Sequence, residues 1–341
     1  MSEFDLIRRY FTRAAPGALL GVGDDAALLQ VSAGNVLAVS TDMLVSGTHF
    51  LPDADPFLLG HKTLAVNLSD LAAMGAAPRW AVLAIALPPK DDGGADEAWL
   101  AQFSAGFFAL AQQHDVELVG GDTTRGPLNL CVTIFGEVPA RQALRRSGAQ
   151  VGDEIWVSGC LGDAALALAH LQGRIALSGA ELAACLPALH RPLPRLALGL
   201  SLRGIASSAI DISDGLLADL GHILEASQMG AEIEFAALPV SPTLRGHVVG
   251  ARASCPLVCG QDAHAPANEL LARQCVLSGG DDYELCFTAP AARRAELAKI
   301  ATRLNLPLTR IGKIVERRGC IVHDTAGNPI NIEVRGYDHF R

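Results

Sequence analysis

Short apolar runs alternate with longer amphipathic stretches along the whole of this chain. The run from Trp80 to Leu87 is typical of a buried strand, and the prolines that follow it end the strand. Before it, Asp55 and Pro56 open a run of apolar residues at helical spacing, with Asp as the cap and Pro in the first turn. The second half begins in a similar way, with a strand over 154–158 and a helix after it. This alternation predicts an α/β protein built of layered sheets and helices.

A polar break divides these elements into two groups. Residues 141–153 are polar, basic and glycine-containing, and a chain of 341 residues is long enough for about two ordinary domains. We therefore expect an N-terminal α/β domain over 1–140 and a C-terminal α/β domain over 150–341. Within the second domain, we expect a strand at Cys275–Ser278 and a surface loop or insertion over 246–268.

The overall charge argues against several classes of partner. With a net charge of −9, the chain lacks the basic faces that nucleic acids and anionic membranes require. No apolar stretch reaches membrane-spanning length, and the first residues contain no secretory core. The eight cysteines are then expected to be free thiols in a reducing compartment. We predict a soluble, cytoplasmic protein that binds neither nucleic acid nor membrane.

The most informative pattern is a set of six short segments in which Asp stands close to Gly, Ser, Thr or Asn. We expect five of them as turns where a strand ends, and the sixth inside a helix, where Asn67 and Asp70 share a face. Ligands of open α/β layers collect at the carboxyl ends of strands, so several of these carboxylates should converge on one crevice. The segments are Gly21–Asp25, Ser40–Asp42, Asn67–Asp70, Gly120–Thr124, Asp211–Asp214 and Gly279–Asp282.

Converging carboxylates need cations between them. Two like charges about 4 Å apart repel by roughly 4 kcal/mol at the dielectric typical of a protein surface. Mg²⁺ suits such oxygen ligands and also bridges phosphates, while glycine lets backbone N–H groups approach a phosphate closely. Any single segment is equally well explained as a turn former or a helix cap. Together, the six predict a phosphate site that holds several magnesium ions.

Other signatures of phosphate or metal binding are absent or weak. The segment Gly21–Ala26 fits the loose dinucleotide pattern, but only with two carboxylates facing the pyrophosphate. No Gly-x4-Gly-Lys-Ser/Thr loop occurs, so metal has to neutralise the phosphate, with help from isolated basic residues such as Arg146. The irregular spacing around Cys255 and Cys259 argues against zinc, and no Gly-x-Ser-x-Gly elbow presents a nucleophile.

The acidic segments, in this order, resemble those of the thiamine-monophosphate kinase family, within the aminoimidazole-ribonucleotide-synthetase-like superfamily. The resemblance covers nearly the whole chain and rests on long blocks. It implies an N-terminal α/β domain that forms a homodimer through its sheet, and a C-terminal α/β domain that covers the nucleotide cleft. The blocks are GVGDDAALL at 21–29, VSTDMLVSGTHF at 39–50, LAVNLSDLAAMGA at 64–76, VGGDTTRGPL at 119–128, AIDISDGLLADLGHI at 209–223, LSGGDDYELCF at 277–287 and GYDHF at 336–340.

Position by position, the resemblance also implies roles for single residues. The family commonly has Glu where this chain has Asp281, so the shorter side chain reaches less far towards the substrate. Contacts to thiamine monophosphate are implied for His49, Asp281 and Tyr337. The magnesium ligands implied are Asp25, Ser40, Thr41, Asp42, Asp70, Asp122, Asp211 and Asp214, and the ATP contacts are Gly121, Asp122, Arg146 and Ser213.

The reaction implied moves the γ-phosphoryl group of ATP onto the phosphate of thiamine monophosphate, which gives thiamine diphosphate. The acceptor oxygen is already anionic, so we expect direct in-line transfer, without a general base and without a phosphoenzyme. Three alternatives remain open: a purine-pathway synthetase of the same superfamily, a non-catalytic Mg-nucleotide-binding module, and a metal-dependent phosphatase. Selenophosphate-forming relatives need a reactive Cys near the N-terminus, whereas the first here is Cys131, and hydrogenase-maturation relatives need a C-terminal Cys, whereas Arg341 ends this chain.

Overall fold

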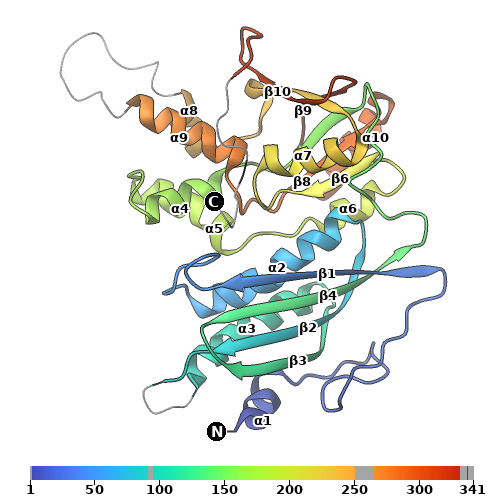
Figure 1. Ribbon diagram of the computed structural model, residues 1–341, viewed down its shortest axis with the longest axis vertical. Coiled ribbons are helices and arrows are strands. Elements are labelled where there is room, and N and C mark those ends of the chain that lie inside the picture. The colour runs from blue at the N-terminus through green and yellow to red at the C-terminus, as the bar shows by residue number, and fades with distance from the viewer. Residues whose placement is uncertain (1, 91–94, 250–264, 331–335, 337–341) are drawn as a thin grey trace. The chain divides into compact units, whose positions relative to one another are not determined.

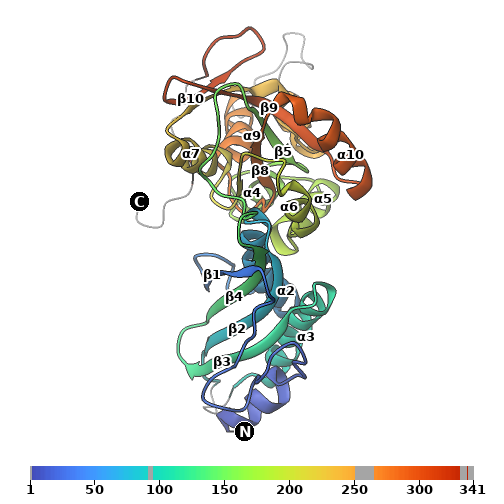
Figure 2. The ribbon, with the colours of Figure 1, turned by 90° about the vertical axis from the view of Figure 1, so that its right-hand side faces the viewer.

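The computed structural model describes residues 2–90, 95–249, 265–330 and 336. The chain separates into two compact units, Met1–Ala143 and Leu144–Arg341. Each unit contains one sheet with helices packed on it, as Figures 1 and 2 show. This arrangement confirms the predicted α/β fold class. Within the described part of the chain, none of the helices has the length and apolarity needed to cross a membrane.

The first unit is built on a four-stranded sheet with the strand order β1-β4-β2-β3. Its β1–β4 and β4–β2 pairs are antiparallel, whereas β2 and β3 run parallel. Helices α2 and α3 pack on one face of this sheet (Figure 2). The elements are α1 (Glu3–Leu6), the π-helix η1 (Ile7–Phe11), β1 (Asn35–Val45), α2 (Pro56–Ala73), β2 (Ala77–Leu87), α3 (Glu97–Gln113), β3 (Glu117–Arg125) and β4 (Asn129–Pro139).

Helix α2 begins as the sequence predicts and is buried along most of its length. The Asp55 carboxylate accepts the Leu58 N–H at 2.9 Å, and Pro56 occupies the first turn. The helix packs backbone to backbone against α3. A Cβ added at Gly60 would lie 2.1 Å from the Phe103 carbonyl oxygen, and one added at Gly106 would lie 1.9 Å from that of Phe57. Only glycine allows the two helices to come this close.

The second unit is built on a six-stranded sheet with the order β10-β7-β9-β5-β8-β6. Only its β10–β7 pair is parallel, and the other neighbours are antiparallel. The elements are β5 (Glu154–Ser158), α4 (Asp163–Leu171), α5 (Gly179–His190), α6 (Leu196–Leu202), β6 (Ser208–Asp211), α7 (Leu216–Ser227), β7 (Gly230–Glu234), the 3₁₀-helix η2 (Phe235–Ala237), α8 (Pro242–Val249), α9 (Ala265–Ser278), β8 (Leu285–Ala289), the 3₁₀-helix η5 (Ala291–Arg293), α10 (Arg294–Leu304), β9 (Leu308–Val315) and β10 (Gly319–His323).

Two local predictions in this unit are wrong. The segment Cys275–Ser278, expected as a strand, forms the end of α9. The buried residues Ala272, Cys275 and Val276 of this helix follow helical spacing. A run of four apolar residues is too short to reveal that spacing in the sequence. The stretch 246–268, expected as a loop, is helical at both ends, because α8 extends to Val249 and α9 begins at Ala265. Its middle part lies outside the described residues.

We predict that Gly106→Ala destabilises the protein by about 2 kcal/mol or more, because the new methyl group would force α2 and α3 apart. Gly221→Ala is the matched control, since Gly221 is also a helix-interior glycine but a Cβ there meets nothing within 4 Å. It should stabilise the protein by about 0.5–1 kcal/mol through helix propensity. Urea unfolding followed by circular dichroism measures both changes. Equal stability of the two variants would contradict the helix contact.

Candidate active site

Two of the acidic segments expected as turns are parts of strands. Ser40–Asp42 lies inside β1, which pairs with β4 along its full length. Gly120–Thr124 lies inside β3, where it pairs with β2. The prediction of turns is wrong here because the neighbouring strand provides partners for the backbone, and Ser, Thr and Asp are tolerated on a sheet with an open face. By contrast, the Asp211–Asp214 segment begins at the last residue of β6, as expected.

Ser40 and Asp70 are brought into contact. The Ser40 hydroxyl donates a hydrogen bond to the Asp70 carboxylate, which joins β1 to the last turn of α2. Because side chains alternate along a strand, Ser40 and Asp42 lie on the face of the sheet that carries α2. Thr41 lies on the other face, where its hydroxyl is 2.9 Å from that of Thr133 on β4.

Asp122 is separated from this group within one chain. The strand registers connect Asp42 through β4 and β2 to Gly121 on β3. Three strand spacings make this separation roughly 14 Å. Asp122 is one residue further along, so it is exposed on the same face as Thr41. The packing of the sheet requires glycine at position 121, because an added Cβ would lie 2.0 Å from the Leu83 carbonyl oxygen.

His49 and Asp25 lie outside the regular elements of the first unit. The Val45 N–H donates to His49 Nδ1 at 3.0 Å. In the neutral imidazole the proton is therefore on Nε2, which is then the donor nitrogen of the ring. Asp25 is exposed in a loop, where its N–H donates to the Asp24 carboxylate at 3.0 Å.

In the second unit, two acidic segments far apart in sequence are joined by their backbones. The Asp281 N–H donates to the Ser213 carbonyl at 2.9 Å, and the Tyr283 N–H donates to the Ile212 carbonyl at 2.8 Å. A Cβ added at Gly280 would lie 2.5 Å from the Ser213 carbonyl oxygen, so the contact requires glycine. Two of the six acidic segments are therefore adjacent, whereas convergence of their carboxylates on one crevice stays a prediction. The cause of the adjacency is backbone pairing, because a mainly antiparallel sheet does not collect its carboxyl ends at one edge.

The Asp281 side chain is held by a residue that the sequence reasoning missed. The Tyr283 hydroxyl donates to the Asp281 carboxylate at 3.1 Å. Both residues have left-handed backbone conformations, with φ values of 69° and 49°. Asp adopts this conformation readily, whereas it is unfavourable for Tyr283. Such strain is concentrated at functional sites. In the sequence, the only pointer to this contact was a Tyr two residues after Asp281, within the block at 277–287.

Asp219 is a second missed residue. The residue is 3% exposed, and its carboxylate accepts the backbone N–H groups of Ser213, Asp214 and Gly215. Burial, with the nearby charges of Asp211 and Asp214, raises the pKa of Asp219 to about 7. An Asp in the first turn of a helix that follows an acidic loop was the sequence signal.

Arg146 and Gly336 border the same region. The Ala209 N–H of β6 donates to the Arg145 carbonyl at 2.9 Å, which places Arg146 beside the strand that ends at Asp211. Gly336 packs on the first turn of α7, where an added Cβ would lie 2.4 Å from the Ala218 Cβ. Tyr337, the next residue, lies outside the described residues.

The residues present suit magnesium in their chemistry. Among residues 2–90, 95–249, 265–330 and 336, no three His, Cys, Asp or Glu side chains are grouped to hold a metal by themselves. The donors near Asp70 are hard oxygens, and the Asn67 Oδ1 one turn before it is buried without a hydrogen-bond partner. Mg²⁺ is usually bound by one or two carboxylates, with waters and substrate phosphates completing its shell. Such sparse oxygen donors therefore fit the ion.

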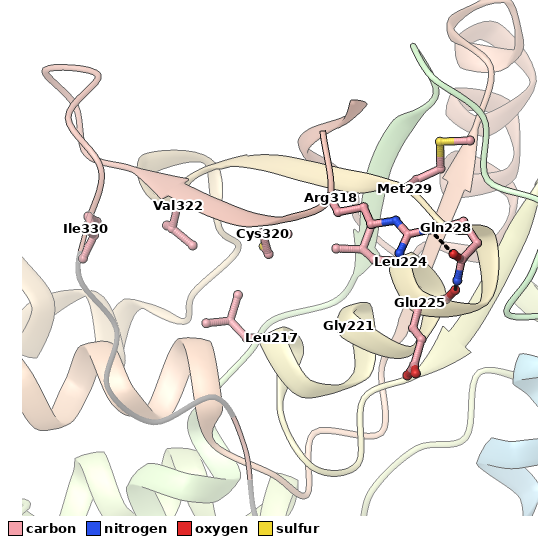
Figure 3. Close-up of a pocket in the computed structure, with 11 residues that line it drawn as sticks. Leu217, Gly221, Leu224, Glu225, Gln228, Met229, Arg318, Cys320, Val322 and Ile330 are labelled. Carbon is pink, nitrogen blue, oxygen red and sulfur yellow. Dashed lines mark hydrogen bonds between the residues drawn. The ribbon is translucent and has the colours of Figure 1, made fainter. Parts of the chain in front are cut away.

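A cavity of about 440 Å³ in the second unit lies elsewhere, between α7 and β10 (Figure 3). Arg318 and Gln228 are hydrogen-bonded at one end of it. None of the residues predicted for the site lines this cavity. Its lining combines the polar side chains of Glu225, Gln228 and Arg318 with apolar ones, among them Leu217, Leu224, Met229, Cys320, Val322 and Ile330.

Both units match known domains. Residues 23–138 match the AIR synthase related protein, N-terminal domain, and residues 150–325 match the corresponding C-terminal domain. Fold and matches together define an AIR synthase related protein.

Over 344 residues the chain is 48% identical to the thiamine-monophosphate kinase of Escherichia coli O157:H7, covering 99% of this chain and 98% of that protein. It is 43% identical to that of Haemophilus influenzae over 351 residues, covering 100% and 98%. The chain belongs to the thiamine-monophosphate kinase family.

Solved structures agree with this assignment. The thiamine-monophosphate kinase of Stenotrophomonas maltophilia K279a has a TM-score of 0.78 and 49% identity, covering 96% of each chain. AaThiL complexed with AMPPCP and TMP has a TM-score of 0.74 and 28% identity, covering 99% of this chain and 96% of that one. The hydrogenase maturation protein HypE of E. coli, at 21% identity and a TM-score of 0.73, shares the fold.

We predict a pH-dependent contribution to stability from Asp282, whose carboxylate accepts the Gly162 N–H at the start of α4 at 2.8 Å. Burial, then the charges of Glu284, Asp163 and Asp281, raises the pKa of Asp282 well above its ordinary value. The folded protein therefore keeps a proton that the unfolded chain, with its pKa near ~3.9, has already released. The free energy of unfolding falls as pH rises through this window.

Asp282→Asn keeps a carbonyl acceptor for Gly162 but cannot ionise. Between pH 5 and pH 8, the wild-type protein should lose more unfolding free energy than the variant, by up to about 1.4 kcal/mol for each pH unit over which only the folded state keeps the proton. Urea unfolding at both pH values measures this difference. Parallel pH profiles for the two proteins would contradict it.

Proposed function

We propose that the chain phosphorylates thiamine monophosphate with ATP, which gives thiamine diphosphate and ADP. The observation that carries the proposal is the backbone hydrogen bond between Asp281 and Ser213. It places the residue expected to bind the phosphate acceptor directly beside the residue expected to bind the nucleotide. The 48% identity with a thiamine-monophosphate kinase over nearly the full chain supports the choice of substrate. AaThiL, which shares the fold, has been solved with AMPPCP, an ATP analogue, and TMP together.

The chemistry requires little from the protein beyond position and charge. The acceptor phosphate oxygen is anionic at neutral pH, so no side chain has to remove a proton from it. The barrier lies in bringing two polyanions together and in stabilising charge on the transferred group. We propose direct in-line transfer, with the Arg146 guanidinium and the Gly121 and Ser213 backbones as contacts to ATP. Trapping of a phosphorylated enzyme during turnover would contradict this route.

Several magnesium ions belong to the proposal, and when bound they would neutralise the phosphates of ATP. The Ser40–Asp70 hydrogen bond supports this assignment, because it fixes the orientation of two of the proposed ligand oxygens before any ion arrives. Asp42 lies on the same face of the sheet as Ser40. Thr41 and Asp122, which are also proposed magnesium ligands, lie on the opposite face. The other proposed ligands are Asp25, Asp211 and Asp214.

Recognition of thiamine monophosphate is proposed for His49, Asp281 and Tyr337. His49 contributes an Nε2–H donor, because its Nδ1 is occupied by the Val45 N–H. The Asp281 carboxylate is oriented by the hydrogen bond from the Tyr283 hydroxyl. A fixed carboxylate suits recognition of the cationic thiamine ring system by charge.

We also propose a cytoplasmic homodimer that forms through the first sheet. On the face of β1 that points away from α2, Leu37, Val39 and Met43 are 37%, 54% and 52% exposed. Their partners on β4 continue this face with Phe135 and Cys131. A row of exposed apolar side chains on a sheet is typical of a protein interface, and a second copy offers the same row. The six cysteines in the described residues are free, which supports a reducing compartment.

The direct test incubates the protein with Mg-ATP and thiamine monophosphate. Thiamine diphosphate and ADP should form in equal amounts, and chelation of the metal should abolish both. Asp70→Asn should lower the rate by about 10²-fold at fixed magnesium, because it removes charge beside Ser40. Asp53→Asn, which changes an exposed carboxylate outside the site, should leave the rate unchanged. Release of phosphate from thiamine monophosphate without ATP would instead establish a phosphatase.

If the dimer forms through the face of β1 that points away from α2, negative charges placed on that face should dissociate it. Val39→Asp combined with Met43→Asp should shift the protein from twice the mass of one chain to a single chain, because paired carboxylates would have to be buried. Val151→Asp is the control, since Val151 is 58% exposed in the other unit. Light scattering after size exclusion measures the mass. A double variant that remains dimeric would place the interface elsewhere.

A further inference from the structure

The proposed chemistry makes no use of Asp219, although its carboxylate accepts three backbone hydrogen bonds. A single oxygen, Oδ2, accepts three consecutive backbone N–H groups, from Ser213 at 3.0 Å, Asp214 at 3.0 Å and Gly215 at 3.1 Å. A buried carboxylate that collects three donors from one loop fixes that loop at three successive points. A loop before a helix can form without a buried carboxylate that accepts three of its N–H groups, so this contact needs an explanation of its own.

The arrangement replaces an ordinary helix cap. Helix α7 begins at Leu216, and the residue before it, Gly215, has no side chain that could cap the free N–H groups. Gly215 has a φ of 116°, a conformation that other residues rarely adopt, and a Cβ there would lie 2.6 Å from the Ser278 carbonyl carbon. The capping oxygen therefore comes from within the helix, one turn later. Asp219 also donates its own N–H to the Gly215 carbonyl at 3.0 Å, which closes the turn from both sides.

The loop held in this way carries the residues that the proposed function needs. Ser213 and Asp214 are the proposed contacts to ATP and magnesium, and the Ser213 carbonyl accepts the Asp281 N–H from the substrate segment. We propose that Asp219 is a positioning residue, which fixes the Ser213–Gly215 loop and thereby sets the affinity of the enzyme for the metal–nucleotide complex. The part that concerns the nucleotide rests on the proposed function. The part that concerns the loop does not.

The size of the effect follows from geometry. Without an acceptor at position 219, three N–H groups lose their partner together, and the loop has to shift to reach water. A displacement of about 1 Å at a binding group costs up to roughly 10²-fold in activity. Because the loop binds the nucleotide before transfer begins, the loss should appear mainly in the KM for Mg-ATP and less in kcat.

The experiment compares Asp219→Ala and Asp219→Asn in the full chain. Asparagine keeps a side-chain carbonyl that can accept the same N–H groups, whereas alanine removes the acceptor. The matched control is Asp153→Ala, because Asp153 is also buried and accepts a loop N–H, from Gln150 at 3.0 Å, in a different turn of the same unit. Hydrogen exchange of the free enzyme, without metal or nucleotide, is measured first, and steady-state kinetics with Mg-ATP second.

We expect Asp219→Ala to raise amide exchange in a peptide covering 213–216 by at least tenfold and the KM for Mg-ATP by about tenfold or more. Asp219→Asn should stay within about threefold of wild type in both measurements. Asp153→Ala should leave both at wild-type values, even where its stability falls. If Asp219→Ala does not fold, as judged by circular dichroism, Asp219→Ser replaces it, because the serine hydroxyl is too short to reach three donors.

The possible outcomes overturn different parts of the proposal. Unchanged exchange over 213–216 in the alanine or serine variant overturns the role of Asp219 in holding the loop. Raised exchange with an unchanged KM for Mg-ATP overturns the link to the nucleotide and leaves a purely structural residue. A wild-type protein without kinase activity overturns the proposed function instead, and the exchange measurement still tests the loop.

Discussion

The site of this protein depends on backbone hydrogen bonds that force acidic segments together. In the second unit, Asp281 and Tyr283 donate their N–H groups to the carbonyls of Ser213 and Ile212. This pairing brings several carboxylates into one region, where their charges oppose the arrangement. Next to this pairing, burial and then the charges of Asp211 and Asp214 raise the pKa of Asp219 to about 7, so a further negative charge is unfavourable there. Cations bound with phosphate groups are the natural means of relieving it.

Glycine makes these close contacts possible at particular positions. Gly280 touches the Ser213 carbonyl, Gly215 touches Ser278, and Gly336 packs on Ala218 of α7. In each case an added Cβ would come within 2.6 Å of another atom, so no larger residue fits without movement. The glycines of these motifs therefore bring backbones together, in addition to any contact that their N–H groups make with phosphate. In the first unit, the Ser40–Asp70 bond has the corresponding role, since it ties a strand to a helix through two proposed ligands.

The sequence predicted the fold class and most long elements, because apolar periodicity and helix caps are local signals. Helix α2 follows its Asp-Pro start closely. It did not predict that Ser40–Asp42 and Gly120–Thr124 lie in strands, because their partners are distant in sequence and only tertiary pairing shows them. The residues Asp219 and Tyr283 were missed for a similar reason, since their roles lie in hydrogen bonds to a loop rather than in a motif position. The proposed ligands named from the resemblance remain predictions.

The central claim is that the acidic segments hold divalent ions together with the phosphates of a nucleotide. Its most direct test is diffraction from crystals grown with Mn²⁺ in place of Mg²⁺ and with AMPPCP, using the anomalous signal of manganese. The account predicts ions within about 2.2 Å of carboxylate oxygens of Asp70 and Asp214, and in contact with the phosphates. Manganese and phosphates located away from both carboxylates would contradict it.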